Sequence, residues 1–135
     1  MPDPKHEHVI AVVNSNEDTA EMLRSCLEQH GFSAVATVDI HDFKTGQSDL
    51  PAFIQQHDPR VIVYDVSLPY DKNWRSLRLL LDTDAMRGRT VVLTTPNKHR
   101  LEEFVGPTDA LEIVGKPYDL EQIVGAVRKA IGVRP

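Results

Sequence analysis

The sequence predicts an α/β domain in which five parallel strands form a sheet between two layers of helices. Three observations predict this fold class. Short apolar runs rich in Val and Ile alternate along the chain with longer segments of helical periodicity. Turn-forming and helix-ending residues, namely Gly, Pro, Asn and Ser, separate the two kinds of segment. Strands that are each followed by a helix return by right-handed crossovers, which gives a doubly wound parallel sheet.

The predicted strands are the apolar runs. In chain order they cover residues 9–13, 33–38, 60–65, 90–94 and 111–114. The run 9–13 is apolar without alternation, which is typical of a strand buried on both faces of a parallel sheet. The run 60–65 has the clearest strand pattern and ends on a carboxylate, whereas 111–114 has the weakest pattern.

The predicted helices fill the gaps between these strands. The first follows the Asn-Ser-Asn turn at 14–16, begins with the acidic residues 17–18 and ends before Gly31. The second starts at Pro51 and ends at Pro59. The inner faces of the first and of the last three helices are marked by apolar residues at helical spacing: Met22, Leu23, Cys26 and Leu27; Trp74, Leu77, Leu80 and Leu81; Leu101, Phe104 and Val105; Leu120, Ile123, Val124, Val127 and Ile131.

Length, charge and cysteine content exclude several classes of protein. The 135 residues suit a single domain, 1–135, and we expect a stand-alone module with a loose lead-in at 1–7 and a surface excursion at 41–50. The net charge of -5 at pH 7 disfavours direct binding of nucleic acid or of a membrane surface. The single Cys26 excludes an internal disulfide and a multi-cysteine zinc site. Because no apolar run is long enough for a signal peptide or a membrane span, we expect a cytoplasmic protein.

Polar residues follow strands that are otherwise apolar. Asn14 and Ser15 come after the first predicted strand, Asp65 ends the third, Thr94 ends the fourth and Lys116 follows the fifth. The carboxyl ends of parallel strands meet at one edge of a sheet, where ligands bind. A carboxylate, a hydroxyl and an ammonium group at this edge suit a phosphoryl group. In that site Asp65 would be the nucleophile, Thr94 a hydrogen-bond donor and Lys116 a charge partner.

Four segments at these strand ends carry a resemblance to a known family. They are VVNSN at 12–16, VYDVSLP at 63–69, VLTT at 92–95 and VGKP at 114–117. In their order and spacing, these segments resemble the receiver domain of two-component response regulators, and the resemblance covers nearly the whole chain.

The resemblance implies a CheY-like, flavodoxin-like three-layer sandwich with the strand order 2-1-3-4-5. It implies that Asp65 is the phosphoacceptor, that Thr94 and Lys116 support the phosphoryl site, and that Asp65 and the backbone carbonyl of Ser67 contact a magnesium ion. The implied partners are a histidine kinase or phosphotransfer protein as the donor, and a downstream protein target bound through the face of the fourth and fifth helices.

The chain departs from the family pattern at three places. Asn14 and Ser15 stand where the family has two adjacent acids, so the acidic pocket is degenerate and we expect magnesium binding to be weakened. Ile113 stands at the position of a switch aromatic. Thr95 stands where the family has a small residue, and its bulk is expected to crowd the phosphoryl entrance.

Two functions stay open at this point. The first is a phosphorelay receiver that accepts a phosphoryl group on Asp65 and signals through a protein surface. The second is a pseudo-receiver that docks partners without phosphorylation, because the metal-binding acids are replaced. An enzyme is not expected, since aspartate-nucleophile phosphatases place a second acid two residues further on, where this chain has Ser67. Simpler roles also suit single residues: Asp65 as a loop cap, Lys116 as its structural ion-pair partner and Thr94 as an ordinary strand residue.

Overall fold

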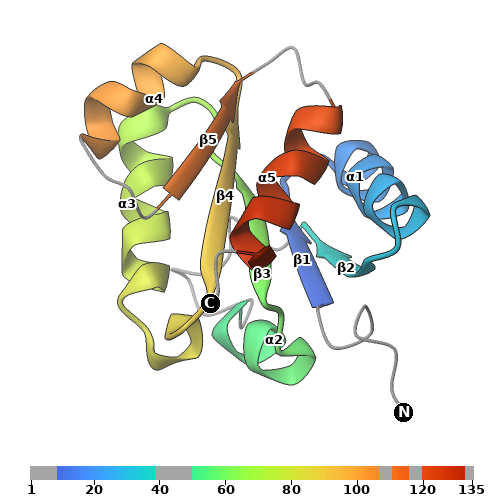
Figure 1. Ribbon diagram of the computed structural model, residues 1–135. Helices are drawn as coiled ribbons and strands as arrows, with labels where there is room; N and C mark the ends of the chain where they lie inside the picture. Colours follow the sequence, from blue (N-terminus) through green and yellow to red (C-terminus); the bar gives the residue numbers. More distant parts are fainter. Residues whose placement is uncertain (1–8, 39–49, 107–110, 116–119, 133–135) are drawn as a thin grey trace.

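The computed structural model describes residues 9–38, 50–106, 111–115 and 120–132, and its sheet is parallel throughout (Figure 1). The strands are β1 (Val9–Val13), β2 (Ser33–Thr37), β3 (Val61–Asp65), β4 (Thr90–Thr95) and β5 (Leu111–Gly115). They lie in the order β2-β1-β3-β4-β5, so β3 is the central strand. The predicted doubly wound parallel sheet is confirmed, and each strand agrees with its predicted range to within one residue.

Helices cover both faces of this sheet. They are α1 (Glu17–Gln29), α2 (Leu50–His57), α3 (Tyr70–Leu81), α4 (Lys98–Val105) and α5 (Leu120–Gly132), with a 3-10 turn η3 (Asp84–Met86) that the sequence pattern did not predict. Figure 1 shows α1 and α5 on one side of the sheet and α3 and α4 on the other. In the part of the chain that the structure describes, no helix has the combined length and apolar character that crossing a bilayer requires.

The helix boundaries follow from capping chemistry. The side-chain oxygen of Asn16 accepts a hydrogen bond from the Thr19 amide at 2.9 Å, and that of Asn97 accepts one from the Arg100 amide at 3.1 Å. Both are N-caps, which satisfy an amide that the first helical turn leaves without a partner. Gly106, at φ 75°, ends α4 in a conformation that residues with a β-carbon rarely adopt. The N-cap predicted from the turn at 14–16 is confirmed.

The core consists of two apolar layers, one on each face of the sheet. One layer joins the strands to α1 and α5, and the other joins them to α2, α3, α4 and η3. Every residue of β3 is buried, as expected for the middle strand of a sheet covered on both sides. Burial of each large aliphatic side chain contributes about 1.5–3 kcal/mol, so these layers supply the main stabilising free energy.

Two side chains predicted to face the core are largely exposed. Met22 is 43% exposed, because α1 buries the stripe formed by Ala20, Leu23 and Leu27, and Met22 lies beside that stripe. Phe104 is 44% exposed, because the short α4 buries only Leu101. The expectations for Trp74 and Cys26 hold in part, since both are partly buried and pack against the core layers.

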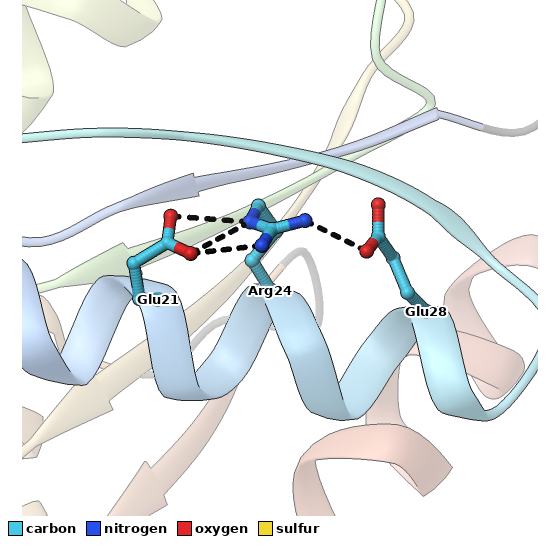
Figure 2. A network of polar contacts seen from close by, with 3 residues as sticks. All are labelled: Glu21, Arg24 and Glu28. Carbon is cyan, nitrogen blue, oxygen red and sulfur yellow. Dashed lines mark hydrogen bonds and ion pairs between the residues drawn. The ribbon is translucent and has the colours of Figure 1, made fainter.

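The outer face of α1 carries a small network of charges (Figure 2). Arg24 lies between two acids one turn away on either side, with Nη2 2.8 Å from Glu21 Oε1 and Nη1 2.7 Å from Glu28 Oε1. The hydrogen bond from Arg24 to Glu21 lowers the pKa of that carboxyl group. Solvent-exposed ion pairs of this kind add little to stability, and we assign the network to the helix surface rather than to a site.

The side chain of Arg89 joins two turns at the amino end of the sheet by hydrogen bonds. Its Nε donates to the Ala85 carbonyl at 2.6 Å, and its Nη1 donates to the Pro59 carbonyl and to Asp58 Oδ1, both at 2.8 Å. The side chain is only 14% exposed. One guanidinium group therefore joins the η3 turn to the turn that leads into β3.

Candidate functional site

The carboxyl ends of β1, β3 and β4 place three polar side chains at one edge of the sheet. Asn14 follows β1, Asp65 is the last residue of β3, and β4 pairs Thr94 directly with Asp65. The strand order reverses between β1 and β3, which is the topological switch point where open α/β sheets bind ligands. Of the polar residues that the sequence predicted at this edge, Asp65 and Thr94 are thus neighbours in the sheet.

Asp65 and Thr94 make a direct buried contact. Thr94 Oγ1 donates a hydrogen bond to Asp65 Oδ1 at 2.8 Å. Asp65 is 8% exposed and Thr94 is fully buried. A hydroxyl group that donates to a carboxylate in such surroundings makes a short, charge-assisted bond, which fixes the orientation of the carboxylate.

Asn14 is buried and holds the turn between β1 and α1. Its side-chain Oδ1 accepts a hydrogen bond from the backbone amide of Asn16 at 2.9 Å. The backbone amide of Asn14 donates to the Thr37 carbonyl of β2 at 3.1 Å. Ser15, the second residue of the predicted degenerate acidic pocket, is exposed. The pocket residues therefore differ in role, because Asn14 shapes the turn while Ser15 lies on the surface.

The loop after Asp65 is held by Asn73, a residue that the sequence analysis missed. Asn73 Nδ2 donates to the Ser67 carbonyl at 2.8 Å and lies 3.3 Å from the Leu68 carbonyl oxygen. The Val66 amide donates to the Thr94 carbonyl at 2.8 Å, which ties the start of the loop to β4. The peptide bond between Leu68 and Pro69 is cis. The only signal in the sequence was an Asn in the first turn of α3, where side chains reach back to the preceding loop.

Thr95 contributes a buried hydroxyl group beside Thr94. It is fully buried, and among the described residues its Oγ1 has no hydrogen-bond partner. A buried hydroxyl group without a partner costs free energy, because it loses its hydrogen bonds to water on folding. The crowding of the phosphoryl entrance that we expected from Thr95 stays a prediction.

Several predicted features lie outside the described residues. They include Lys116, the lead-in at 1–7 and nearly all of the segment 41–50, of which only Leu50 is described, as the first residue of α2. Ile113 is described through its backbone, which pairs with Leu93 of β4. The roles proposed for Lys116 and Ile113 therefore stay predictions.

The described residues at this edge offer few ligands for a magnesium ion. Magnesium takes hard oxygen ligands in octahedral geometry, usually including one or two carboxylates. Asp65 is the acid at the end of these strands, while Asn14 Oδ1 and the Ser67 carbonyl both already accept protein hydrogen bonds. Within the described ranges, no group of three or more His, Cys, Asp or Glu side chains is placed to hold a metal ion. Of the two predicted ligands, Asp65 and the Ser67 carbonyl, the carbonyl already accepts a hydrogen bond from Asn73, and weakened magnesium binding stays a prediction.

Tyr64, next to Asp65 in β3, makes the protein sensitive to alkali. Burial, and to a lesser extent the Asp65 carboxylate, raises the pKa of Tyr64 well above its ordinary value. The folded chain therefore keeps a proton that the unfolded chain loses above about pH 10, so stability falls as the pH rises from there.

We expect the free energy of unfolding, measured by urea denaturation between pH 8 and pH 11, to fall as the pH rises. Above pH 10 this residue contributes up to about 1.4 kcal/mol of that fall for each pH unit. The variant Tyr64→Phe should show a smaller fall over the same interval. An equal fall in both proteins would show that other groups cause the loss.

Comparison with known proteins identifies the fold. Neither a scan against models of protein families nor a search of curated proteins gives a match. A response regulator receiver domain (CheY-like) from Methylobacillus flagellatus aligns with a TM-score of 0.68 at 16% identity, over 91% of this chain and 98% of that one. A sensor protein from Polaromonas sp. JS666 aligns with a TM-score of 0.70 at 18% identity, over 92% of this chain and 95% of that one. A transiently phosphorylated switch of bacterial signal transduction gives 0.72 at 18% identity, over 95% and 97%. The chain thus matches each of these structures over more than nine-tenths of its length, and all three identities are 18% or lower, so the match shows the fold.

Proposed function

We propose that this chain, which has the fold of CheY-like response regulator receiver domains, is a cytoplasmic signalling module that accepts a phosphoryl group on Asp65. The observation that carries the proposal is the buried 2.8 Å contact between Thr94 Oγ1 and Asp65 Oδ1 at the switch point of the sheet. A nucleophilic carboxylate whose orientation is fixed by a hydroxyl donor is what an acyl phosphate site requires.

The chemistry assigned to these residues is a single transfer. A carboxylate oxygen of Asp65 forms a bond to phosphorus, while the bond from phosphorus to the leaving nitrogen of a phosphohistidine breaks and the nitrogen keeps the electron pair. The Thr94 hydroxyl then serves as a hydrogen-bond donor to the new phosphoryl oxygens, and Lys116 as their charge partner. The module is a substrate in this reaction and not a turnover enzyme.

The proposed partners are proteins. A histidine kinase or a phosphotransfer protein supplies the phosphoryl group, and a downstream target binds the face of α4 and α5. The net charge of -5 supports a partner that is neither nucleic acid nor a membrane surface.

A second function is favoured by a specific observation, namely the two amide contacts beside Asp65. Asn14 Oδ1 and the Ser67 carbonyl each accept a hydrogen bond from this chain, and Asn14 and Ser15 stand in place of two acids, so an assisting cation would have few ligands. In this alternative the chain is a pseudo-receiver that docks partners without being phosphorylated.

Acetyl phosphate distinguishes the two functions. We expect intact-protein mass spectrometry to show one added phosphoryl group after incubation with acetyl phosphate and excess MgCl₂, and no addition in Asp65→Asn. The matched control is Asp71→Asn, which removes an exposed acid from the first turn of α3 and should leave the addition unchanged.

No added mass in the natural protein would leave the docking module as the function. An added mass that persists in Asp65→Asn would place the acceptor elsewhere and overturn the proposal.

A further inference from the structure

We infer that Asn73 is a positioning residue whose side-chain amide holds the loop after Asp65 without the help of a divalent cation. The inference rests on the proposed function only in taking this pocket as the functional site. It does not require that Asp65 is phosphorylated.

The first step in the argument is the contact itself. Two carbonyl oxygens, those of Ser67 and Leu68, lie 2.8 and 3.3 Å from the side-chain nitrogen of Asn73. Carbonyl oxygens accept hydrogen bonds and do not donate them, so the NH₂ end of the amide must face the loop. Asn73 also donates its backbone amide to the Pro69 carbonyl at 3.1 Å, which ties the residue to the start of α3.

The second step is what these bonds do for the loop. Backbone carbonyl groups of a loop are satisfied by water, by N–H donors or by a cation, and here one side-chain nitrogen contacts two of them. The N-cap position of α3 is Pro69, whose side chain makes no capping hydrogen bond. The side chain of Asn73 instead bonds the start of the helix to the preceding loop, at the Ser67 carbonyl. The loop that follows Asp65 is thereby fixed by groups of this chain.

The third step is the matching arrangement on the other side of the pocket. Asn14 Oδ1 accepts from the Asn16 amide at 2.9 Å and so holds the turn after β1. The two loops that flank Asp65 are thus each closed by an asparagine side chain. Each loop thus has a hydrogen bond that is supplied by this chain, so we expect the folded pocket to keep its structure without a cation.

The experiment compares the Mg²⁺ dependence of unfolding in two Asn→Asp variants. In Asn73→Asp the residue loses the N–H donor that the contact uses and gains a carboxylate beside two free carbonyl groups. In Asn97→Asp, the matched control, the residue keeps the side-chain oxygen that caps α4 and gains the same charge. The thermal midpoint of each protein is measured with EDTA and then across a MgCl₂ titration.

We expect the midpoint of the natural protein and of Asn97→Asp to be the same in EDTA and in MgCl₂. The midpoint of Asn73→Asp should be lowered in EDTA and should rise with MgCl₂, with a Mg²⁺ affinity at least about tenfold above that of the natural protein. Asn73→Ala, which removes the donor without adding charge, should be destabilised in EDTA and should not respond to MgCl₂ as strongly as the Asp variant.

A natural protein whose midpoint rises with MgCl₂ as much as that of Asn73→Asp would overturn the inference. If Asn73→Asp does not fold, Mg²⁺ perturbation of amide NMR shifts at residues 65–68 in Asn73→Ala replaces the midpoint as the readout. Shifts no larger than in the natural protein would then overturn it.

A double variant, Asn14→Asp with Ser15→Asp, tests where the cation position lies. It should be less stable in EDTA, because like charges crowd Asp65, and should regain stability in MgCl₂. No response in this variant would show that the cation position is not at this edge, and the inference would fail. None of these measurements depends on phosphorylation. The inference about Asn73 can therefore fail while the proposed phosphorylation of Asp65 holds, and the reverse is also true.

Discussion

Replacing Arg89 with alanine is expected to lower the free energy of unfolding by about 2–4 kcal/mol. The guanidinium group donates to two backbone carbonyls and to Asp58, and it is largely buried. Its removal leaves the Ala85 and Pro59 carbonyls without their charged donor. Urea denaturation followed by circular dichroism measures the change. The comparison requires that the m value, the slope of the unfolding free energy against urea concentration, is the same in both proteins.

Arg87→Ala is the matched control for this prediction. Arg87 pairs with Asp84 at 3.1 Å, but the two side chains are 84% and 89% exposed. Exposed pairs contribute about 0–1 kcal/mol, so the control variant should stay close to the natural protein. If both arginine variants lose the same stability, the loss reflects charge in general and not the clamp that Arg89 forms.

Two neighbouring threonines are expected to respond to the same substitution with opposite signs. Thr94→Val removes the donor of the buried bond to Asp65 and should cost about 1.5–3 kcal/mol, because the carboxylate loses a charge-assisted partner. Thr95→Val replaces a fully buried hydroxyl group, unpaired among the described residues, with a methyl group of similar size. It should raise the free energy of unfolding by about 1 kcal/mol. Urea unfolding of both variants at pH 7 gives the comparison.

Thr94→Ser separates the hydroxyl group from the packing at that position. Serine keeps the donor and loses only a methyl group, so its loss should be smaller than that of Thr94→Val. A Thr95→Val protein that is less stable than the natural one would show that the hydroxyl group finds a partner in solution. Equal losses in the Ser and Val variants at position 94 would show that the bond to Asp65 contributes little.

The sequence predicted the strands well because burial on both faces leaves little choice of residue. The run 60–65 contains three β-branched residues and ends on the residue that pairs with Thr94, so strand and site could be located together. The start of α1 was also predictable, because the capping residue Asn16 precedes it in the sequence.

The contacts that hold the site and the far turns were not predictable in the same way. Arg89 bonds to residues about thirty positions away, and no local pattern specifies such a partner. Asn73 reaches back six residues to Ser67, and its amide could equally have faced solvent. Asn14 appeared in the sequence as a lost acid, whereas the structure shows a turn held by its side-chain oxygen.

The central place of β3 has a consequence for how this edge of the molecule moves. β3 pairs with β1 on one side and β4 on the other, and all its residues are buried, so its amide hydrogens exchange with solvent only when the whole domain opens. The loop after Asp65 leaves the sheet, and Leu68 in it is 71% exposed, so we expect this loop to open at a lower free energy than the strand. Asp65 therefore lies between a strand buried on both faces and a loop that leaves the sheet, so we expect a chemical change at its carboxylate to alter the loop before it disturbs the strands.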